Sequence, residues 1–144
     1  MTNVFTIDTP CFYRISVKAL VWDESHTKFM VVEEADGRFE FPGGGLDFGE
    51  DYRAGLTREI KEEMGLEITS ISDAPTHFIT FHRDNEKENI WMANLFYEVK
   101  LKNLDFTPSN ECVSLRFVNA EEALALNAFS NVHQLAGEML RKSA

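Results

Sequence analysis

The sequence predicts a mixed α/β or α+β fold in which helices pack against a β-sheet. Three observations indicate this class. Short runs rich in β-branched and aromatic residues recur along the chain, a segment with helical periodicity interrupts them, and two more helical segments follow the last run. A chain of 144 residues can bury a sizeable core, so we expect one domain over residues 1–144.

The runs that favour β-structure are short and are separated by polar turns. The strands are expected at Tyr13–Trp22, Lys28–Val32, Arg38–Phe41, Thr76–Phe81, Ile90–Val99 and Ser114–Val118. A turn at 23–27 (DESHT) separates the first two strands. The charged segment 83–89 (RDNEKEN) precedes the fifth and is a candidate lining of a substrate cleft.

The central helix is expected at Glu50–Met64. Apolar residues recur there at four-residue spacing, which predicts one buried stripe. Glu50 and Asp51 place negative charge at the N-terminal end, and Gly65 suits a left-handed C-cap. Two further helices are expected at Ala120–Leu126 and Asn131–Arg141, with Asn131 as the N-cap of the second.

Composition limits the partners of the chain. The formal net charge of −10 disfavours binding to nucleic acid, and no apolar stretch approaches the length of a membrane span. The start of the sequence lacks the features of a signal peptide. Cys11 and Cys112 match neither a disulfide framework nor a zinc pattern, so a reducing, cytoplasmic location is expected.

Three carboxylates lie close together on the central helix. At about 100° per residue, Glu59, Glu62 and Glu63 fall within about 100° of one helix face. Two such charges about 5 Å apart repel by about 3 kcal/mol at an effective dielectric of about 20. The cluster is either a solvated face with Arg58 and Lys61 as partners, or a site for a hard divalent cation.

The surroundings of this cluster favour the cation site. Gly44 is followed after five residues by Glu50, and after seven more by the run REIKEEMGL at 58–66. This spacing fills every specified position of the Nudix box, so the chain resembles the Nudix hydrolase family (MutT-like). The glycines at 43–45 and the flanking strands are similar to that family as well.

The resemblance implies a Nudix fold, a mixed β-sheet sandwiched between helices, and metal-dependent hydrolysis of a nucleoside diphosphate linked to another group. Glu59, Glu62 and Glu63 would bind Mg²⁺ or Mn²⁺, with the backbone carbonyl of Gly43 as a further ligand. Glu59 is the favoured general base. Arg58 would orient the carboxylates by pairing with Glu50. Gly44, Gly65 and Glu50 would support the site.

Other site residues are open between two interpretations. Glu111 is either a further metal ligand or the general base, or it is an exposed turn residue before the strand 114–118. That strand carries Phe117 at a position where the family often has tryptophan. Either Phe81 and His82 contact a nucleobase, or Phe81 belongs to the core and His82 to the surface. Asn127 lies near the last helix, where relatives place substrate contacts, as do Asn131 and His133.

The substrate is expected to be a small nucleotide derivative, with a nucleoside triphosphate or a nucleotide sugar favoured. Signatures of the subclasses that cleave ADP-ribose, dinucleoside polyphosphates and NADH are missing. The alternatives are a Nudix fold that binds a ligand without turnover, and a calcium-binding structural domain, against which the lack of an EF-hand loop counts. A homodimer is left open, because no sequence feature specifies an interface.

Overall fold

A computed structural model describes residues 12–84 and 89–143. It contains eight strands and three helices in these residues. The strands are β1 (Tyr13–Leu20), β2 (Phe29–Glu33), β3 (Phe39–Glu40), β4 (Gly43–Gly45), β5 (Ile68–Ile71), β6 (His77–Asp84), β7 (Asn89–Leu101) and β8 (Ser114–Val118). The helices are α1 (Tyr52–Met64), α2 (Ala120–Ala125) and α3 (Ser130–Ser143).

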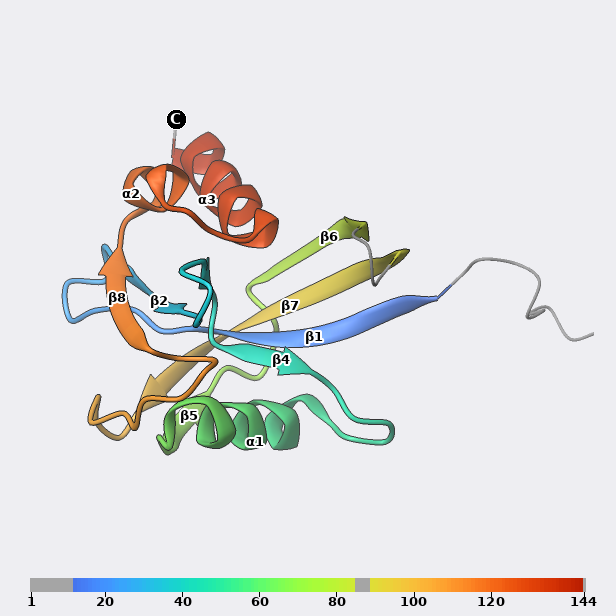
Figure 1. Cartoon of the computed structure of the whole chain (residues 1–144), viewed down its shortest axis with the longest axis vertical. Helices are drawn as coiled ribbons and strands as arrows, with labels where there is room; N and C mark the ends of the chain where they lie inside the picture. The colour runs from blue at the N-terminus through green and yellow to red at the C-terminus, as the bar shows by residue number, and fades with distance from the viewer. Residues whose placement is uncertain (1–11, 85–88, 144) are drawn as a thin grey trace, which may run out of the picture.

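The strands form two sheets between helical layers, with α1 on one side and α2 and α3 on the other (Figure 1). The larger sheet has the order β4-β1-β7-β5. On the edge of β7 away from β1, β5 pairs with the C-terminal part of the strand and β6 pairs with its N-terminal part. Its two central strands, β1 and β7, run parallel, with Lys18 opposite Phe96. The smaller sheet has the order β3-β2-β8.

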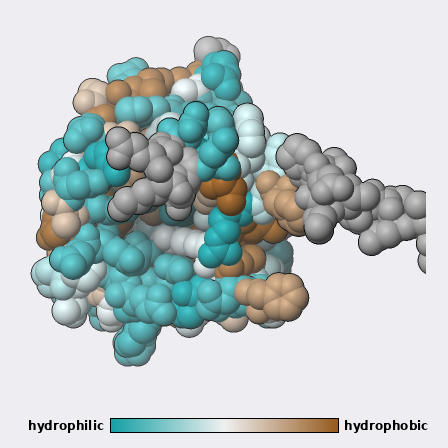
Figure 2. Space-filling view, turned by 45° about the vertical axis from the view of Figure 1, so that its right-hand side comes forward, coloured by the Kyte–Doolittle hydropathy of each residue, from teal (hydrophilic) through white to brown (hydrophobic). Residues whose placement is uncertain are grey.

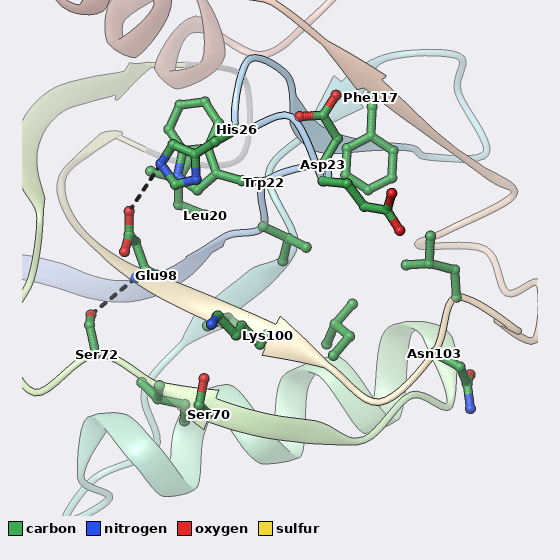
Figure 3. A pocket seen from close by; sticks show the side chains of 16 residues that line it. Leu20, Trp22, Asp23, His26, Ser70, Ser72, Glu98, Lys100, Asn103 and Phe117 are labelled. Carbon is green, nitrogen blue, oxygen red and sulfur yellow. Dashed lines mark hydrogen bonds and ion pairs between the residues drawn. The ribbon is translucent and has the colours of Figure 1, made fainter.

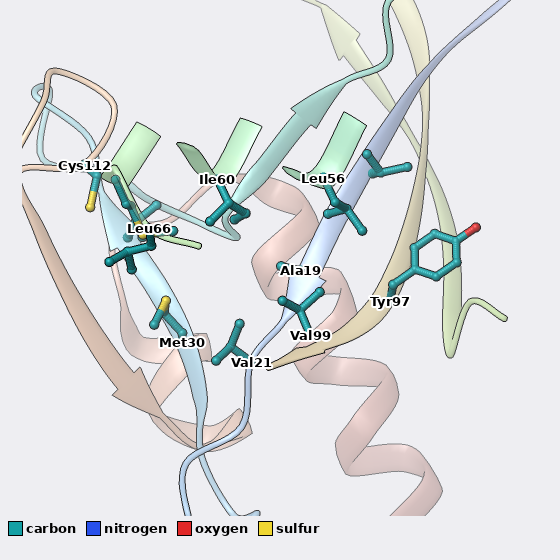
Figure 4. Close-up of a cluster of buried hydrophobic side chains, with 12 residues drawn as sticks. Ala19, Val21, Met30, Leu56, Ile60, Leu66, Tyr97, Val99 and Cys112 are labelled. Carbon is teal, nitrogen blue, oxygen red and sulfur yellow. The ribbon is translucent and has the colours of Figure 1, made fainter. Parts of the chain in front are cut away.

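Helix α1 is fixed to the larger sheet by an apolar stripe. Leu56, Ile60 and Met64 are fully buried against odd-numbered residues of β1 and β7, as Figure 4 shows for Ala19 and Tyr97. Alternate residues of a strand face opposite sides of a sheet, so the even-numbered residues of β1 face away from α1. Burying each of the large apolar side chains of α1 contributes about 1.5–3 kcal/mol.

A second core lies under the C-terminal helices. Val132, Leu135 and Ala136 of α3 pack with Phe41 and Phe96, whose rings meet edge to face with their centroids 4.9 Å apart. Among the described residues, no helix has both the length and the apolar character needed to cross a membrane. The visible surface is mainly hydrophilic, with hydrophobic residues in small patches (Figure 2).

The predicted strands and helices are found in the structure with shifts at their ends. Two strands were missed: β4, which consists only of glycines, and β5, which has polar residues at two of its four positions. Helix α1 begins at Tyr52, with Asp51 as its N-cap and Gly65 as its left-handed C-cap. The prediction that Asn131 caps the last helix is wrong, because α3 begins at Ser130 and Asn131 is buried within its first turn.

The predicted lining by the segment RDNEKEN can be followed only in part. Arg83 and Asp84 end β6 and Asn89 begins β7, whereas residues 85–88 lie outside the described residues. Cys11 lies outside them as well, and Cys112 is a free, buried thiol.

Candidate active site

The strand β4 brings a bare backbone to the edge of the larger sheet. Gly43 has φ +121°, and a Cβ atom there would lie 2.2 Å from the carbonyl oxygen of Val17. At Gly44 a Cβ atom would lie 2.6 Å from the carboxyl carbon of Glu59. The glycines therefore let β4 approach β1 on one side and the carboxylates of α1 on the other.

Glu63 connects α1 to this strand. Its carboxyl oxygen Oε1 accepts a 2.8 Å hydrogen bond from the backbone N–H of Gly43, and only 4% of the residue is exposed. Burial raises the pKa of the Glu63 carboxyl to about 8, although the charge of Lys18 and the hydrogen bond from Gly43 act in the opposite direction. Among the described residues it has no ion-pair partner, so a bound cation would compensate its charge.

This pKa predicts how the stability of the metal-free protein depends on pH. Between pH 4.5, the ordinary value for glutamate, and about 8, the folded protein holds a proton that the unfolded chain has lost. The free energy of unfolding therefore falls as the pH rises through this window. Thermal unfolding in a chelator should show a steeper loss of Tm from pH 5 to 8 for the wild type than for Glu63→Gln. Parallel profiles of the two proteins would contradict the assignment.

Arg58 is the centre of an ion-pair network beside these carboxylates. Its guanidinium donates to both oxygens of Glu50 at 2.8 Å, to Glu59 at 2.9 Å and to Glu62 at 3.2 Å. It also donates to the backbone oxygen of Gly45 at 3.1 Å. The bonds from Arg58 lower the pKa of Glu50 to about 2. The predicted pairing of Arg58 with Glu50 is confirmed, and it fixes the side of α1 that faces β4.

The acidic residues named from the sequence are not equally placed. Glu59, Glu63 and Glu111 line one cleft, whereas Glu62 is more than half exposed and bonded to Arg58. Glu111 reaches the cleft because its loop is held to α1, where Ser109 Oγ donates to the backbone oxygen of Glu63 at 2.7 Å. Within residues 12–84 and 89–143, no three acidic, histidine or cysteine side chains are arranged closely enough to hold a metal ion.

The donor set nevertheless fits a hard divalent cation. Carboxylates and backbone carbonyls are the ligands that Mg²⁺ and Mn²⁺ prefer, and Mg²⁺ sites complete their coordination with water and phosphate oxygens. The buried carboxyl of Glu63, which has no ion-pair partner among the described residues, and the bare backbone at 43–45 supply the donor and the space.

The cleft has a volume of about 610 Å³ and extends from Glu59 and Glu63 of α1, past β4, to the face of β1 that carries Ser16 and Lys18. In the described residues, the buried polar or charged side chains all lie in its walls or directly beneath it. They are Ser16, Lys18, Glu40, Glu63, Asn94 and Asn131. From the sequence, Glu63 was assigned to the site and Asn131 was left open between a substrate contact and a helix cap. The other four were not assigned, although the alternation in ISVKALV (15–21) puts Ser16 and Lys18 on one face.

The residues proposed from the sequence to bind the nucleotide lie elsewhere in the structure. His82 is stacked on Trp91, on the opposite face of the sheet from the cleft-lining Met92. Phe81 is paired with Met92 and shares its face, but it does not line the cleft. Asn127 is exposed outside the cleft and donates to the backbone oxygen of Gly37 at 3.5 Å.

A larger cavity, of about 860 Å³, lies at the other end of the sheet (Figure 3). Trp22, Lys100 and Phe117 are among its lining residues, and none of the α1 carboxylates reaches it. Phe117 also pairs with Met30 across β2 and β8. Because neither the α1 carboxylates nor the glycines of β4 line this cavity, we place the active site in the smaller cleft.

A mixed sheet between helices, with a glycine strand leading into a helix that carries Arg58 and three glutamates, defines the class of Nudix-fold proteins. Comparison with known proteins agrees. The profile of the NUDIX domain matches residues 12–140. The nucleoside triphosphatase NudI of Klebsiella pneumoniae is 29% identical over 120 residues, with coverage of 76% of this chain and 84% of that protein. NudI of Salmonella paratyphi B is 30% identical over 105 residues, with coverage of 65% and 74%.

A solved structure gives the same result for the fold. The MutT protein of Methanosarcina mazei matches with a TM-score of 0.74 at 20% identity, over 96% of this chain and 99% of that one. The chain belongs to the Nudix family, and it is a Nudix hydrolase.

Proposed function

We propose that this hydrolase cleaves a pyrophosphate bond in a nucleoside diphosphate linked to another group, and that it requires Mg²⁺ or Mn²⁺. The observation that carries the proposal is that Glu59, Glu63 and Glu111 line one cleft together with Gly43, whose backbone N–H is bonded to Glu63. We also expect the protein to act in the cytoplasm, without nucleic acid or membrane as a partner.

The cation would be held by Glu59, Glu63 and the carbonyl of Gly43, with Glu62 and Glu111 as further ligands. When bound, it supplies charge neutralisation for phosphate oxygens and a water of lowered pKa. The chain supplies the rest. Arg58 holds Glu59 in place through its 2.9 Å bond, and Glu59 is the residue we assign to accept the proton of the attacking water.

A nucleoside triphosphate is the favoured substrate, with a nucleotide sugar as the second choice. The support is that the NudI relatives carry the name nucleoside triphosphatase. The identity of about 30% supports the class of reaction more strongly than the identity of the substrate's nucleobase.

The test is a panel of nucleoside triphosphates, their 8-oxo forms, nucleotide sugars, ADP-ribose and dinucleoside polyphosphates, each incubated with and without Mg²⁺. We expect metal-dependent cleavage of one class, detected as released phosphate or pyrophosphate and as nucleotide products by chromatography. A protein that binds one of these compounds with Mg²⁺ but cleaves none would contradict the proposal.

A further inference from the structure

Lys18 is a charged side chain in the floor of the cleft. It occupies β1 between buried residues, and only 6% of it is exposed. The even-numbered residues Arg14, Ser16 and Lys18 all line the cleft, so the position of Lys18 follows from strand alternation. A buried ammonium group is costly unless its charge and its hydrogens have partners.

The partners of Lys18 within the protein are incomplete. Its Nζ donates one long hydrogen bond, 3.3 Å, to the backbone oxygen of Gly43 and lies 3.8 Å from the nearest oxygen of Glu40. An ammonium group has three hydrogens to donate. Among the residues that the structure describes, Lys18 makes no other hydrogen bond or ion pair.

Glu40 is not free to move onto Lys18. Its Oε1 accepts bonds from the backbone N–H of Phe41 at 2.8 Å and from Asn131 Nδ2 at 2.7 Å. Asn131 in turn donates to Asn94 at 2.9 Å. These bonds fix the carboxylate at its long distance, so Lys18 keeps donor capacity toward the cleft.

We infer that Lys18 binds a phosphate oxygen of the substrate. The carboxylates proposed to hold the cation line the same cleft as Lys18, and the oxygens of a polyphosphate are strong acceptors for the ammonium hydrogens left without a partner. The phosphate chain is then held between the metal-binding carboxylates and the ammonium group. This inference rests on the proposed function, since it takes the ligand of the cleft to be a polyphosphate.

The experiment compares two variants that share a neutral side chain at position 40 and differ only in the ammonium of Lys18. Lys18→Met alone would leave Glu40 unpaired in the floor, which destabilises a fold strongly. The comparison is therefore between Glu40→Gln, which keeps the Oε1 acceptor, and the double variant Glu40→Gln with Lys18→Met. Lys100→Met, at an exposed lysine outside the cleft, controls for the change in net charge. Thermal unfolding confirms that each variant is folded.

We expect the double variant to bind inorganic tripolyphosphate about 10- to 100-fold more weakly than Glu40→Gln, in calorimetry with Mg²⁺ present. The KM for the nucleotide should rise by a similar factor. Affinity for Mn²⁺ without phosphate, measured by electron paramagnetic resonance, should not decrease. Lys100→Met should match the wild type in all three measurements.

Two results would overturn the inference. One is unchanged tripolyphosphate affinity in the double variant. The other is a parallel loss of Mn²⁺ affinity, which would show that Lys18 acts through the carbonyl of Gly43. If the wild type cleaves no nucleotide, the proposed function fails, while the tripolyphosphate measurement still decides the role of Lys18.

Discussion

Replacing Glu59 with glutamine is expected to reduce kcat by about 10²–10⁴-fold, the range for loss of a general base. The loss can exceed this range, because the same carboxylate is proposed to bind the metal. Glutamine keeps the shape of the side chain and the Oε1 acceptor for Arg58, so the fold should survive. Steady-state kinetics with saturating Mg²⁺, together with thermal unfolding, would measure both effects.

Glu67→Gln is the matched control for this prediction. Glu67 is exposed, just beyond the end of α1, and pairs with Lys102 at 3.6 Å; neither residue lines the cleft. The same chemical change there should leave kcat within about twofold, since exposed ion pairs contribute little. Turnover retained by Glu59→Gln at near the wild-type rate would assign the base to another residue, with Glu111 the next candidate in the cleft.

Replacing Gly43 with alanine is expected to have the largest effect on stability. The φ of +121° is strained for any residue with a side chain, and the new Cβ would meet the backbone of β1 at Val17 and Lys18. Strain at such a position costs of the order of 1–3 kcal/mol before the collision is counted. A loss of about 3 kcal/mol lowers Tm by roughly 10 °C in a domain of this size.

Gly49→Ala separates the two causes. Gly49 also has a positive φ, +84°, but nothing lies within 4 Å of the Cβ position. We expect a loss of about 1–2 kcal/mol from backbone strain alone. Denaturation curves of the two variants would give the contribution of the β1 contact by difference. Equal losses at Gly43 and Gly49 would show that β4 can move away from β1 without cost.

The helix that carries the site could be predicted from the sequence because several local signals agree. The apolar residues of α1 repeat at four-residue spacing, and Asp51 and Gly65 provide its caps. The pairing of Arg58 with Glu50 was also predicted, from the family pattern. By contrast, β4 has no side chains to show a periodicity, and its pairing with β1 depends on a contact between distant parts of the chain.

The roles of residues in and beneath the floor of the cleft could not be predicted from local sequence patterns. Asn131 looked like a helix cap because asparagine favours that position, but in the structure its amide bonds Glu40 and Asn94 on other elements. Lys18 is one charge in an apolar strand, and its importance depends on the burial that the fold gives it. Such roles are set by tertiary contacts, to which neither propensity nor motif spacing is sensitive.

The parallel pairing of β1 with β7 has a consequence for how the enzyme becomes active. Tyr13 pairs with Trp91, 78 residues further along the sequence, yet the two strands form the centre of the sheet that supports the cleft. Such long-range pairings are costly in chain entropy and slow to form, with folding times typically of milliseconds to seconds. During synthesis, the α1 segment leaves the ribosome well before β7 does. We therefore expect the nascent chain to stay inactive until the second half of the protein has emerged.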